Sequence, residues 1–208
     1  MTRVEQPPPV DPGERAKQER RRQILEAAKG VFADAGYHGA SINAIIERAQ
    51  IARGTFYLYF ESKSAVFESI LDQALADLRS RIRRINVEDP AAPAPQLQLR
   101  EQVHTTLQYI LRDRPLAILL LSAGHTPDAE AAERVDQFYT EVRDLLRRAF
   151  ETGVEIGLLR ECHAELCAAA MLGMIRGVIE LLVRQGSAAN VDEVVSEMLM
   201  VALRGVLK

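Results

Sequence analysis

Apolar residues return every three or four positions along most of this 208-residue chain, and no segment alternates apolar and polar residues as a half-buried strand would. Between Arg20 and Ala35, for example, the apolar side chains share one helical face, and Gly36 then supplies a stop. In the rest of the chain, prolines, glycines and serines separate the apolar segments into lengths typical of helices. The pattern predicts an all-α protein of about nine helices, with short helices at the N-terminus and longer ones behind them.

Capping and helix-breaking residues bound these expected helices. Ser41 can cap a short second helix, and Ser62 can cap a long helix that carries apolar residues as far as Ile85. At 1.5 Å per residue this long helix would span about 36 Å, enough to connect two layers. The expected helices cover residues 20–35, 41–49, 53–59, 62–85, 96–112, 115–123, 128–156, 164–185 and 191–207.

Proline-rich segments suggest where the domains begin. Four of the first twelve residues are proline, which removes backbone donors, so residues 1–13 are expected to form a disordered arm. Residues 89–95 hold three further prolines and mark a boundary or a loop. We expect a small helical domain over residues 14–62 and a larger helical domain over residues 63–208.

The composition, with 48% hydrophobic and 26% charged residues, is that of a soluble globular protein. Cys162 and Cys167 are the only cysteines, so a disulfide framework is excluded. The N-terminus lacks the apolar stretch of a secretory signal, and no apolar run approaches the roughly 18 residues needed to span a bilayer. These features predict a cytoplasmic protein that does not associate with a membrane.

Charge is unevenly distributed along the chain. The formal net charge is −3, which taken alone argues against nucleic acid as a partner. Residues 15–63, however, hold nine basic and five acidic side chains, a local charge of +4, whereas residues 90–208 carry −4. A basic N-terminal module attached to an acidic body therefore needs an explanation, and binding to the phosphates of nucleic acid is one.

Two short helices joined by a tight turn, the second starting at Arg53, form a candidate helix-turn-helix, in which the second helix would enter a DNA major groove. In the run ARGTFYLYFESK over residues 52–63, Phe56 and Phe60 lie four positions apart and would face the core. Arg53 and Tyr57 share another face and would reach outward. The alternative interpretation is a packed aromatic stripe beneath a solvated, charged face.

The order of these elements is typical of one family. Residues about 17–65 resemble the N-terminal domain of the TetR family of bacterial transcriptional regulators, over the sequence ILEAAKGVFADAGYHGASINAIIERAQIARGTFYLYFESKSAVF. The matching features are the alanine-rich first helix, the glycine and tyrosine after it, the IIERA second helix and the GTFYLYFESK third. Asn43 departs from the family, in which this position is often acidic or otherwise variable. Ala52 and Arg53 occupy variable positions that set the choice of operator.

The resemblance implies a ligand-responsive DNA-binding transcriptional regulator, expected to be a repressor and not an enzyme. It would bind a palindromic double-stranded DNA operator as a homodimer, and an unidentified small-molecule effector of apolar or amphipathic character would release it. Residues 14–62 would be the DNA-binding domain, and residues 63–208 would bind the ligand and form the dimer. By resemblance, the expected DNA-binding residues are Ser41, Asn43, Arg53, Gly54, Thr55, Tyr57, Tyr59 and Lys63.

The helix expected over residues 164–185 is apolar nearly all round, so we expect it to be buried on two sides. Its small residues would let a second helix approach closely, and the last helix supplies a matching apolar stripe. Two such helices from each of two subunits would form a four-helix interface, although packing within one subunit is the alternative. The expected interface residues are Ala170, Gly173, Gly177, Val195, Met198, Leu199 and Ala202.

A ligand pocket is expected between the helices over residues 96–112, 128–156 and 164–185. Such a pocket has mostly apolar walls with a few polar groups. For each candidate residue, ordinary core packing is the competing assignment. The candidates are His104, Leu107, Leu111, His125, Phe138, Val142, Met171 and Ile175, with Tyr139 and Arg176 as further polar contacts.

Other chemistries have weaker support in the sequence. Cys162, His163 and Cys167 suggest a metal or thiol-sensor site, but a structural zinc site needs four ligands and no fourth lies nearby in the sequence. The sequence has no phosphate-binding loop, nucleophile elbow or HExxH motif, so we expect no catalytic site, metal or cofactor. A helical module that binds protein in place of DNA is a further alternative, and its binding would depend little on salt.

Overall fold

The computed structural model describes residues 11–122, 129–186 and 190–203. Within these ranges the chain forms nine α-helices and no strand, which confirms the all-α prediction. The helices are α1 (Pro12–Gly39), α2 (Ile42–Ala49), α3 (Arg53–Tyr57), α4 (Lys63–Arg81), α5 (Pro95–Arg112), α6 (Arg114–Ser122), α7 (Ala129–Glu155), α8 (Ala164–Gln185) and α9 (Val191–Leu203).

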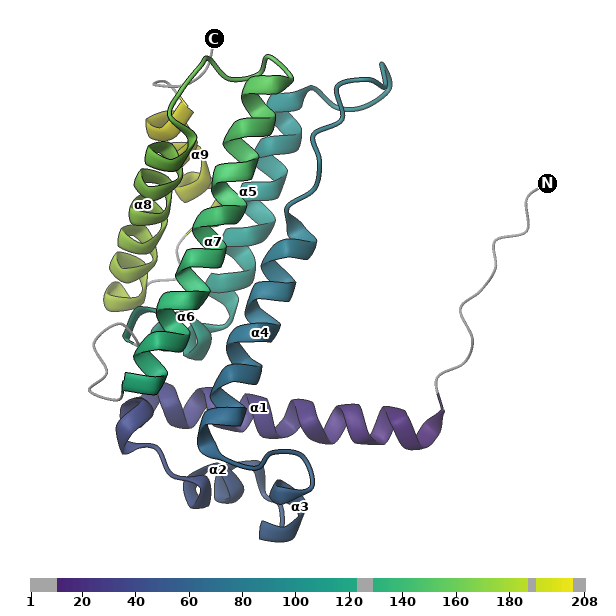
Figure 1. Cartoon of the computed structure of the whole chain (residues 1–208), viewed down its shortest axis with the longest axis vertical. Helices are drawn as coiled ribbons and strands as arrows, with labels where there is room; N and C mark the ends of the chain where they lie inside the picture. Colours follow the sequence, from purple (N-terminus) through teal and green to yellow (C-terminus); the bar gives the residue numbers. More distant parts are fainter. Residues whose placement is uncertain (1–10, 123–128, 187–189, 204–208) are drawn as a thin grey trace, which may run out of the picture.

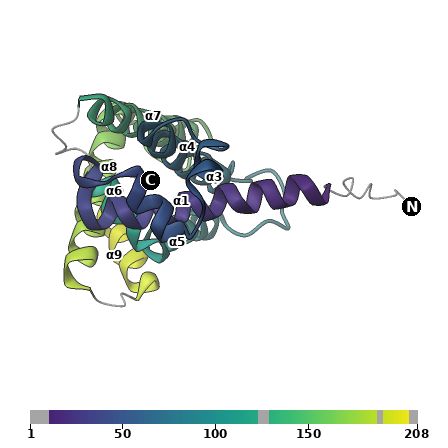
Figure 2. The same ribbon diagram turned by 90° about the horizontal axis from the view of Figure 1, so that it is seen from below.

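The helices are arranged in two parts along the long axis of the molecule (Figure 1). Helices α1 to α3 lie together at one end, which we call the head, and helices α4 to α9 form the body, a bundle that runs away from it. Helix α1 lies across the base of this bundle and packs against α2, α4 and α6. Helices α8 and α9 lie along one side of the body, and the N-terminal part of α1 projects on the other side (Figures 1 and 2).

Local signals in the sequence set the helix ends of the head. Ser41 and Ser62 cap α2 and α4 as predicted, because each hydroxyl accepts a hydrogen bond, at 3.1 Å, from the backbone NH three residues further on. Gly36 has φ 68° and ψ 168°, so it interrupts α1 where the sequence predicts a stop. Gln50 ends α2 at φ 53°, in the left-handed region where glycine is usual. The turn of the helix-turn-helix is therefore made by a non-glycine residue.

Helix α1 begins earlier than predicted. It starts at Pro12, whereas the apolar pattern begins only near residue 20. Proline suits the first turn of a helix, because the NH group that it lacks would have no partner there. The first residues of α1 thus fall within the segment expected to be a disordered arm, and residues 1–10 lie outside the described part.

Helix α4 ends earlier than predicted, at Arg81 and not at Ile85. The extended backbone that follows is held by side chains of α5. The amides of Gln98 and Gln102 make hydrogen bonds of 2.8 to 3.2 Å with backbone groups of residues 83–86. These bonds replace the helical ones, so the apolar periodicity alone overestimates the length of α4.

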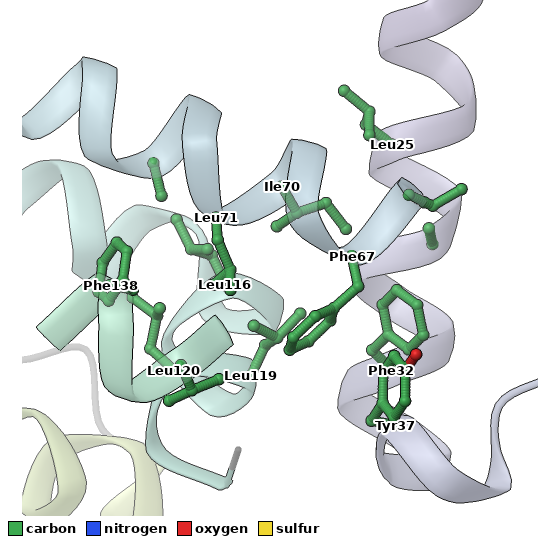
Figure 3. Packing of buried hydrophobic residues seen from close by; sticks show 14 of the residues in the cluster. Leu25, Phe32, Tyr37, Phe67, Ile70, Leu71, Leu116, Leu119, Leu120 and Phe138 are labelled. Carbon is green, nitrogen blue, oxygen red and sulfur yellow. The ribbon is translucent and has the colours of Figure 1, made fainter. Parts of the chain in front are cut away.

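One hydrophobic core runs from the head into the body. Phe32 and Tyr37 of α1 pack with Phe67 of α4, with ring centroids 4.7 to 5.6 Å apart. The cluster continues along α4 to α6 and to Phe138 of α7 (Figure 3). The head and the body therefore share one closely packed interior.

Helix α8 departs from the expectation that no segment is apolar enough to span a membrane. By length and composition alone, α8 qualifies as a membrane-spanning helix. Little of it is buried within the chain, although one side packs against α6 and α7. One such helix is weak evidence for a membrane protein, so its exposed apolar face requires a different explanation.

Candidate nucleic-acid interface

Helix α2, the turn at residues 50–52 and helix α3 form the helix-turn-helix that the sequence predicts. Phe56 and Phe60 are 0% and 4% exposed, and their ring centroids lie 6.1 Å apart, so both face the core as expected. Their burial fixes the rotation of α3 about its axis. Helix α3 lies at the end of the head that is remote from the body, with its other face turned to solvent (Figure 1).

Arg53, Asn43 and Tyr57 form a connected group on this solvent face. The guanidinium of Arg53 donates a hydrogen bond to Oδ1 of Asn43 at 3.4 Å. Cζ of Arg53 also lies 5.9 Å from the centre of the Tyr57 ring, and Tyr57 is 44% exposed. The prediction that Arg53 and Tyr57 share an outward face is confirmed. Together the three side chains offer hydrogen-bond donors and acceptors to a partner such as DNA.

Two neighbouring residues complete this surface. A Cβ atom built on Gly54 would meet no atom of the described chain within 4 Å, so internal packing does not require glycine there. The missing side chain instead leaves the helix backbone open to a partner. Leu58, which was not among the predicted residues, is 80% exposed just after α3. Its position midway between two inward phenylalanines is the sequence signal that could have found it.

Other predicted residues are engaged within the head. The hydroxyl of Ser41 caps α2, and Tyr59 packs against the hydrophobic core. Nζ of Lys63 donates hydrogen bonds to the carbonyl oxygens of Tyr37 and Ala40 at 2.7 and 3.1 Å, and it lies 4.4 Å from the centre of the Tyr37 ring. Lys63 therefore joins the start of α4 to the end of α1, and its contact with DNA stays a prediction.

An ion pair links the head to the body. Nζ of Lys29 on α1 contacts the carboxylates of Asp113, just before α6, and of Glu26. Burial lowers the pKa of Lys29, but its hydrogen bonds and charge interactions with these carboxylates outweigh burial, so the pKa is raised and the ammonium is charged at neutral pH. Asp113 also accepts a hydrogen bond from the Leu116 NH at 3.0 Å and so caps α6.

Known protein families account for both parts of the chain. Residues 24–70 match the domain described as bacterial regulatory proteins, tetR family. Residues 92–206 match the tetracyclin repressor-like C-terminal domain, and this match alone covers more than half of the chain. The chain belongs to the TetR family.

Individual relatives of this TetR-family protein are also described as transcriptional regulators. It is 26% identical over 195 residues to YhgD, an uncharacterized HTH-type transcriptional regulator of Bacillus subtilis, with 83% of this chain and 98% of that protein covered. It is 28% identical over 200 residues to the transcriptional repressor KstR2 of Rhodococcus jostii, with 96% of each covered. The structure of FadR from Bacillus subtilis in complex with stearoyl-CoA shares the fold, with a TM-score of 0.72 and 20% identity over 87% of this chain and 96% of that one. As a family member, the chain is a ligand-responsive DNA-binding transcriptional regulator.

A polar groove of about 1000 Å³ opens between α1, α4 and α5 of this regulator. In it the hydroxyl of Tyr109 donates a hydrogen bond to Asp77 at 3.0 Å, and Cζ of Arg81 lies 4.1 Å from the Tyr109 ring centre. Burial and the nearby Asp77 carboxylate raise the pKa of Tyr109, so its hydroxyl stays protonated. Glu26 and Asp113, which bind Lys29, line the same groove. None of the predicted pocket residues that the structure describes lines it.

The apolar residues of the predicted pocket are distributed over three hydrophobic clusters. Phe138 and Val142 of α7 pack in the main core, and Met171 of α8 packs in a second cluster between α7 and α8. Leu107 of α5 packs in a third cluster with α9, while Ile175 of α8 touches both this cluster and the main core. These residues therefore pack into three hydrophobic clusters and not around the groove, and the pocket stays a prediction.

The polar candidates for this pocket have partners within the chain. Nε2 of His104 lies 3.5 Å from Oδ1 of Asp192 at the start of α9. The hydroxyl of Tyr139 donates a hydrogen bond to a backbone carbonyl of α6 at 2.6 Å, and Cζ of Arg176 lies 4.3 Å from the Tyr139 ring centre. The remaining two candidates are Leu111, which is half-buried, and His125, which lies outside the described residues.

The predicted dimer residues of α8 are exposed. Ala170, Gly173 and Gly177 lie on the same helix face as Leu166 and Leu181, which are 65% and 53% exposed. The spacing of three or four positions between successive members makes this face continuous along α8. We call these five residues the α8 face.

The predicted dimer residues of α9 have different positions. Val195 and Met198 are 0% and 5% exposed, because they pack against α5 of their own subunit. They are therefore not available to a partner. Leu199 and Ala202 are half-buried, and the exposed apolar residues of α9 are Met200 and Val201.

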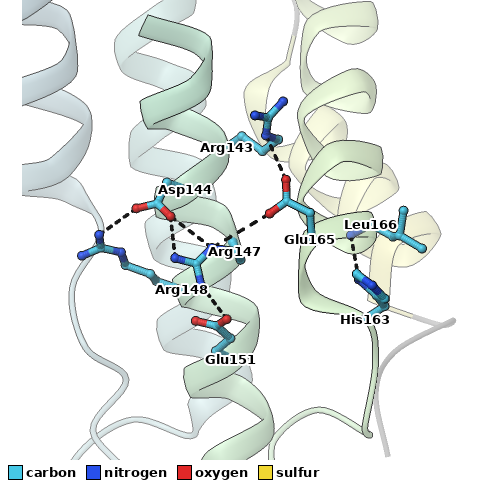
Figure 4. Close-up of polar contacts among 8 residues, drawn as sticks. All are labelled: Arg143, Asp144, Arg147, Arg148, Glu151, His163, Glu165 and Leu166. Atoms are coloured by element: carbon cyan, nitrogen blue, oxygen red, sulfur yellow. Dashed lines mark hydrogen bonds and ion pairs between the residues drawn. The ribbon is translucent and has the colours of Figure 1, made fainter. Parts of the chain in front are cut away.

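An ion-pair network joins α7 to α8 (Figure 4). Nε of Arg143 lies 3.1 Å from the Glu165 carboxylate, and Nε of Arg147 lies 3.9 Å from it. Arg147 also donates hydrogen bonds to Asp144 on its own helix, which hold the pKa of Asp144 below its ordinary value. Nδ1 of His163 accepts a hydrogen bond from a backbone NH in the first turn of α8 and caps that helix.

The two cysteines adjoin this network. Cys162 and Cys167 are free and half-buried beside the cluster between α7 and α8. Burial, together with Cys162, raises the pKa of the Cys167 thiol, so this thiol is protonated at neutral pH. In the described ranges no group of three or more His, Cys, Asp and Glu residues is arranged to hold a metal ion.

Proposed function

We propose that this protein is a repressor that binds a palindromic operator as a homodimer and leaves it when a small effector binds. The solvent face of α3 carries the proposal, because Arg53, Tyr57 and Leu58 project from it while two phenylalanines anchor the helix. Base edges in the major groove are read by side chains that project from one face of a recognition helix. The excess of basic residues over residues 15–63 complements the surrounding phosphates.

The residues of this surface suit different tasks. The guanidinium of Arg53 matches the two acceptors of guanine, and the amide of Asn43 matches adenine. Leu58 can contact the methyl group of thymine. We assign phosphate contacts, which fix register without reading sequence, to the remaining predicted residues. These are Ser41, Gly54, Thr55, Tyr57, Tyr59 and Lys63.

The α8 face is the proposed dimer interface. Its small residues Ala170, Gly173 and Gly177 allow close approach of a second helix, and the flanking Leu166 and Leu181 supply apolar area. A two-fold axis through this face brings the same residues of both subunits together, as an isologous interface requires. Burial against a second subunit accounts for an apolar helix that one subunit leaves largely exposed.

The proposed effector is a small amphipathic molecule with an apolar part. The apolar side chains that α5, α7 and α8 contribute to the hydrophobic clusters support this class, and His104, Tyr139 and Arg176 on the same helices offer polar contacts. The fold shared with a FadR structure that holds stearoyl-CoA makes long-chain acyl-CoA the first class to test. The proposal places the protein in the cytoplasm and gives it no catalytic step.

Helix α4 is the proposed lever between effector and operator. It begins at the Ser62 cap in the head, contributes Phe67 to the continuous core and ends beside the groove at Arg81. An effector that binds more tightly to dimers whose heads are wrongly spaced for successive major grooves shifts the population away from the DNA-bound form. The operator is then released.

Selection of binding sites tests this function. The full-length protein is incubated with a pool of duplexes that contain 30 random base pairs, and the bound fraction is amplified and sequenced over several rounds. We expect an inverted repeat whose half-sites are centred about 10 base pairs apart or a multiple of it. A pool that stays random would contradict DNA recognition, and an enriched single half-site would contradict the dimer. Stearoyl-CoA should then weaken binding to the selected duplex, whereas coenzyme A without the acyl chain should not.

A further inference from the structure

The first part of α1 extends beyond the head, and no other described element covers it. Every residue from Asp11 to Arg22 is exposed, and the buried face of α1 begins only at Ile24. At 1.5 Å per residue, residues 12–23 extend about 18 Å. We call residues 12–23 the N-terminal arm. Figure 2, seen from below, shows it projecting to one side past α3.

The N-terminal arm is rich in positive charge. Its acidic residues are Glu14 and Glu19, and Glu19 is already paired with Arg22 at 2.7 Å. The side chains of Arg15 and Lys17 make no hydrogen bond or ion pair within the part of the chain that the structure describes. The basic residues of the arm are Arg15, Lys17, Arg20, Arg21 and Arg22.

Contacts at its base hold the arm beside the helix-turn-helix. Nε2 of Gln23 donates a hydrogen bond to the carbonyl of Ala49, at the end of α2, at 2.7 Å. Cζ of Arg21 lies 5.3 Å from the ring centre of Phe60, just after α3. Lys17 lies one helical turn before Arg21, on the same face. This cationic face of the arm is therefore turned to the side of the head that carries α2 and α3.

We propose that the N-terminal arm binds the phosphates of duplex DNA outside each half-site of the operator. This proposal rests on the proposed operator binding and extends it to flanking DNA. The arm projects on the opposite side of the molecule from α8 and α9 (Figures 1 and 2). In a dimer formed through the α8 face, both arms point away from the two-fold axis. Each arm then extends along the DNA that flanks its own half-site. A length of about 18 Å corresponds to about 5 base pairs at 3.4 Å each.

The charge of the arm fits phosphates better than bases. Lysine and arginine side chains on an exposed helix supply point charges that bind any sequence, and each phosphate contact releases counterions. The arm should therefore add affinity that depends on the length of the duplex and on salt, and not on the flanking sequence. The two acidic residues, Glu14 and Glu19, offset only part of the charge of the five basic residues and leave the arm with a formal charge of +3.

The test compares the double variant Lys17→Gln/Arg20→Gln with wild type on two duplexes taken from the selection described above. The short duplex contains only the two half-sites, and the long duplex adds 8 base pairs of arbitrary sequence at each end. Fluorescence anisotropy gives Kd for each pair between 50 and 300 mM KCl. The variant Arg83→Gln/Arg84→Gln removes the same charge at exposed positions of the body, just after α4, and serves as the matched control.

Wild type should bind the long duplex about tenfold or more tightly than the short one at low salt, and the arm variant should lose this advantage. Four lost contacts per dimer should lower the slope of log Kd against log salt by up to about 3.6 on the long duplex. On the short duplex the arm variant and wild type should bind equally. Circular dichroism checks that the arm variant keeps its helix content.

The proposal is overturned if the arm variant and wild type gain equally from the flanks, or if the control variant loses as much as the arm variant. Either result leaves recognition of the short duplex intact, so the proposed operator binding would stand. If wild type does not prefer the selected short duplex over a shuffled one, the proposed sequence-specific binding to an operator is contradicted instead. Loss of binding to phosphatidylglycerol vesicles with unchanged DNA binding would assign the arm to a lipid surface and also overturn the proposal.

Discussion

Lys29 of the head and Asp113 of the body form an ion pair that crosses between α1 and the start of α6. The side chain of Lys29 is 12% exposed, and that of Asp113 is 23% exposed, so the pair is largely shielded from water. Asp113 also lines the groove between α1, α4 and α5, so the ion pair lies at the boundary between the head and the body.

Removing either charge should destabilise the protein. We expect Lys29→Met and Asp113→Asn each to lower the free energy of unfolding by about 1–3 kcal/mol. Lys29→Met leaves the Asp113 carboxylate without its cation, and Asp113→Asn leaves Lys29 paired with Glu26 alone. Asparagine keeps an oxygen that can cap α6, so Asp113→Asn isolates the charge from the cap. Denaturant unfolding of the single variants and the double variant gives the coupling. Costs that add without any interaction energy would show that the pair does not act as a unit.

Lys63 should contribute to both stability and DNA affinity. Its ammonium holds two carbonyl oxygens at the end of α1, so Lys63→Ala should cost about 1–3 kcal/mol of unfolding free energy. If it also contacts a phosphate, the variant should weaken binding to a selected duplex and to its shuffled counterpart by the same factor. Thermal unfolding and anisotropy measure the two effects separately. Unequal losses on the two duplexes would assign Lys63 to reading sequence.

Gln50 offers a route to a more stable helix-turn-helix. Its left-handed conformation strains any residue with a Cβ atom, so Gln50→Gly should stabilise the protein by about 0.5–1 kcal/mol. For a chain of this size that corresponds to a rise in Tm of about 1–4 °C. Gln50→Ala retains the Cβ atom and should bring no gain, which makes it the control. An equal rise in both variants would show that strain at this turn is not the cause.

The α8 face predicts the oligomeric state. Leu181 is 53% exposed, so Leu181→Glu should fold as one subunit but place two carboxylates near each other across the proposed two-fold axis. We expect light scattering with size-exclusion chromatography to find a dimer for wild type and a monomer for this variant. Leu97→Glu changes an equally exposed leucine of α5 and should leave the dimer intact. A dimer that survives Leu181→Glu would place the interface elsewhere.

Local sequence signals predicted most of the fold, because capping and periodicity act over a few residues. Ser41 and Ser62 cap helices as predicted, and Phe56 and Phe60 are buried as their spacing indicates. The early end of α4 was not predictable, since it depends on amides of α5 that are distant in sequence from the backbone they bind. Hydrogen bonds between residues that are distant in sequence produce no periodic pattern from which they could be predicted.

The part of the candidate site that depends on local helix geometry was predictable, and the part that depends on tertiary packing was not. The outward face of Arg53 and Tyr57 follows from helical geometry once the inward residues are known. The engagement of Lys63 with α1 and of Val195 and Met198 with α5 depends on tertiary packing, which a single sequence does not report. The groove between α1, α4 and α5 brings together three separated segments and had no sequence signal of its own.

Binding of wild type and Arg53→Ala to a selected duplex and to a shuffled duplex of equal length tests the account most directly. Arg53 is exposed on the recognition face and is a predicted base contact, so its loss should cost about 1–3 kcal/mol on the selected duplex and much less on the shuffled one. We expect Arg53→Ala to narrow the ratio of the two Kd values by about fivefold or more. A ratio of one for wild type, or a ratio unchanged by Arg53→Ala, would contradict sequence recognition through α3.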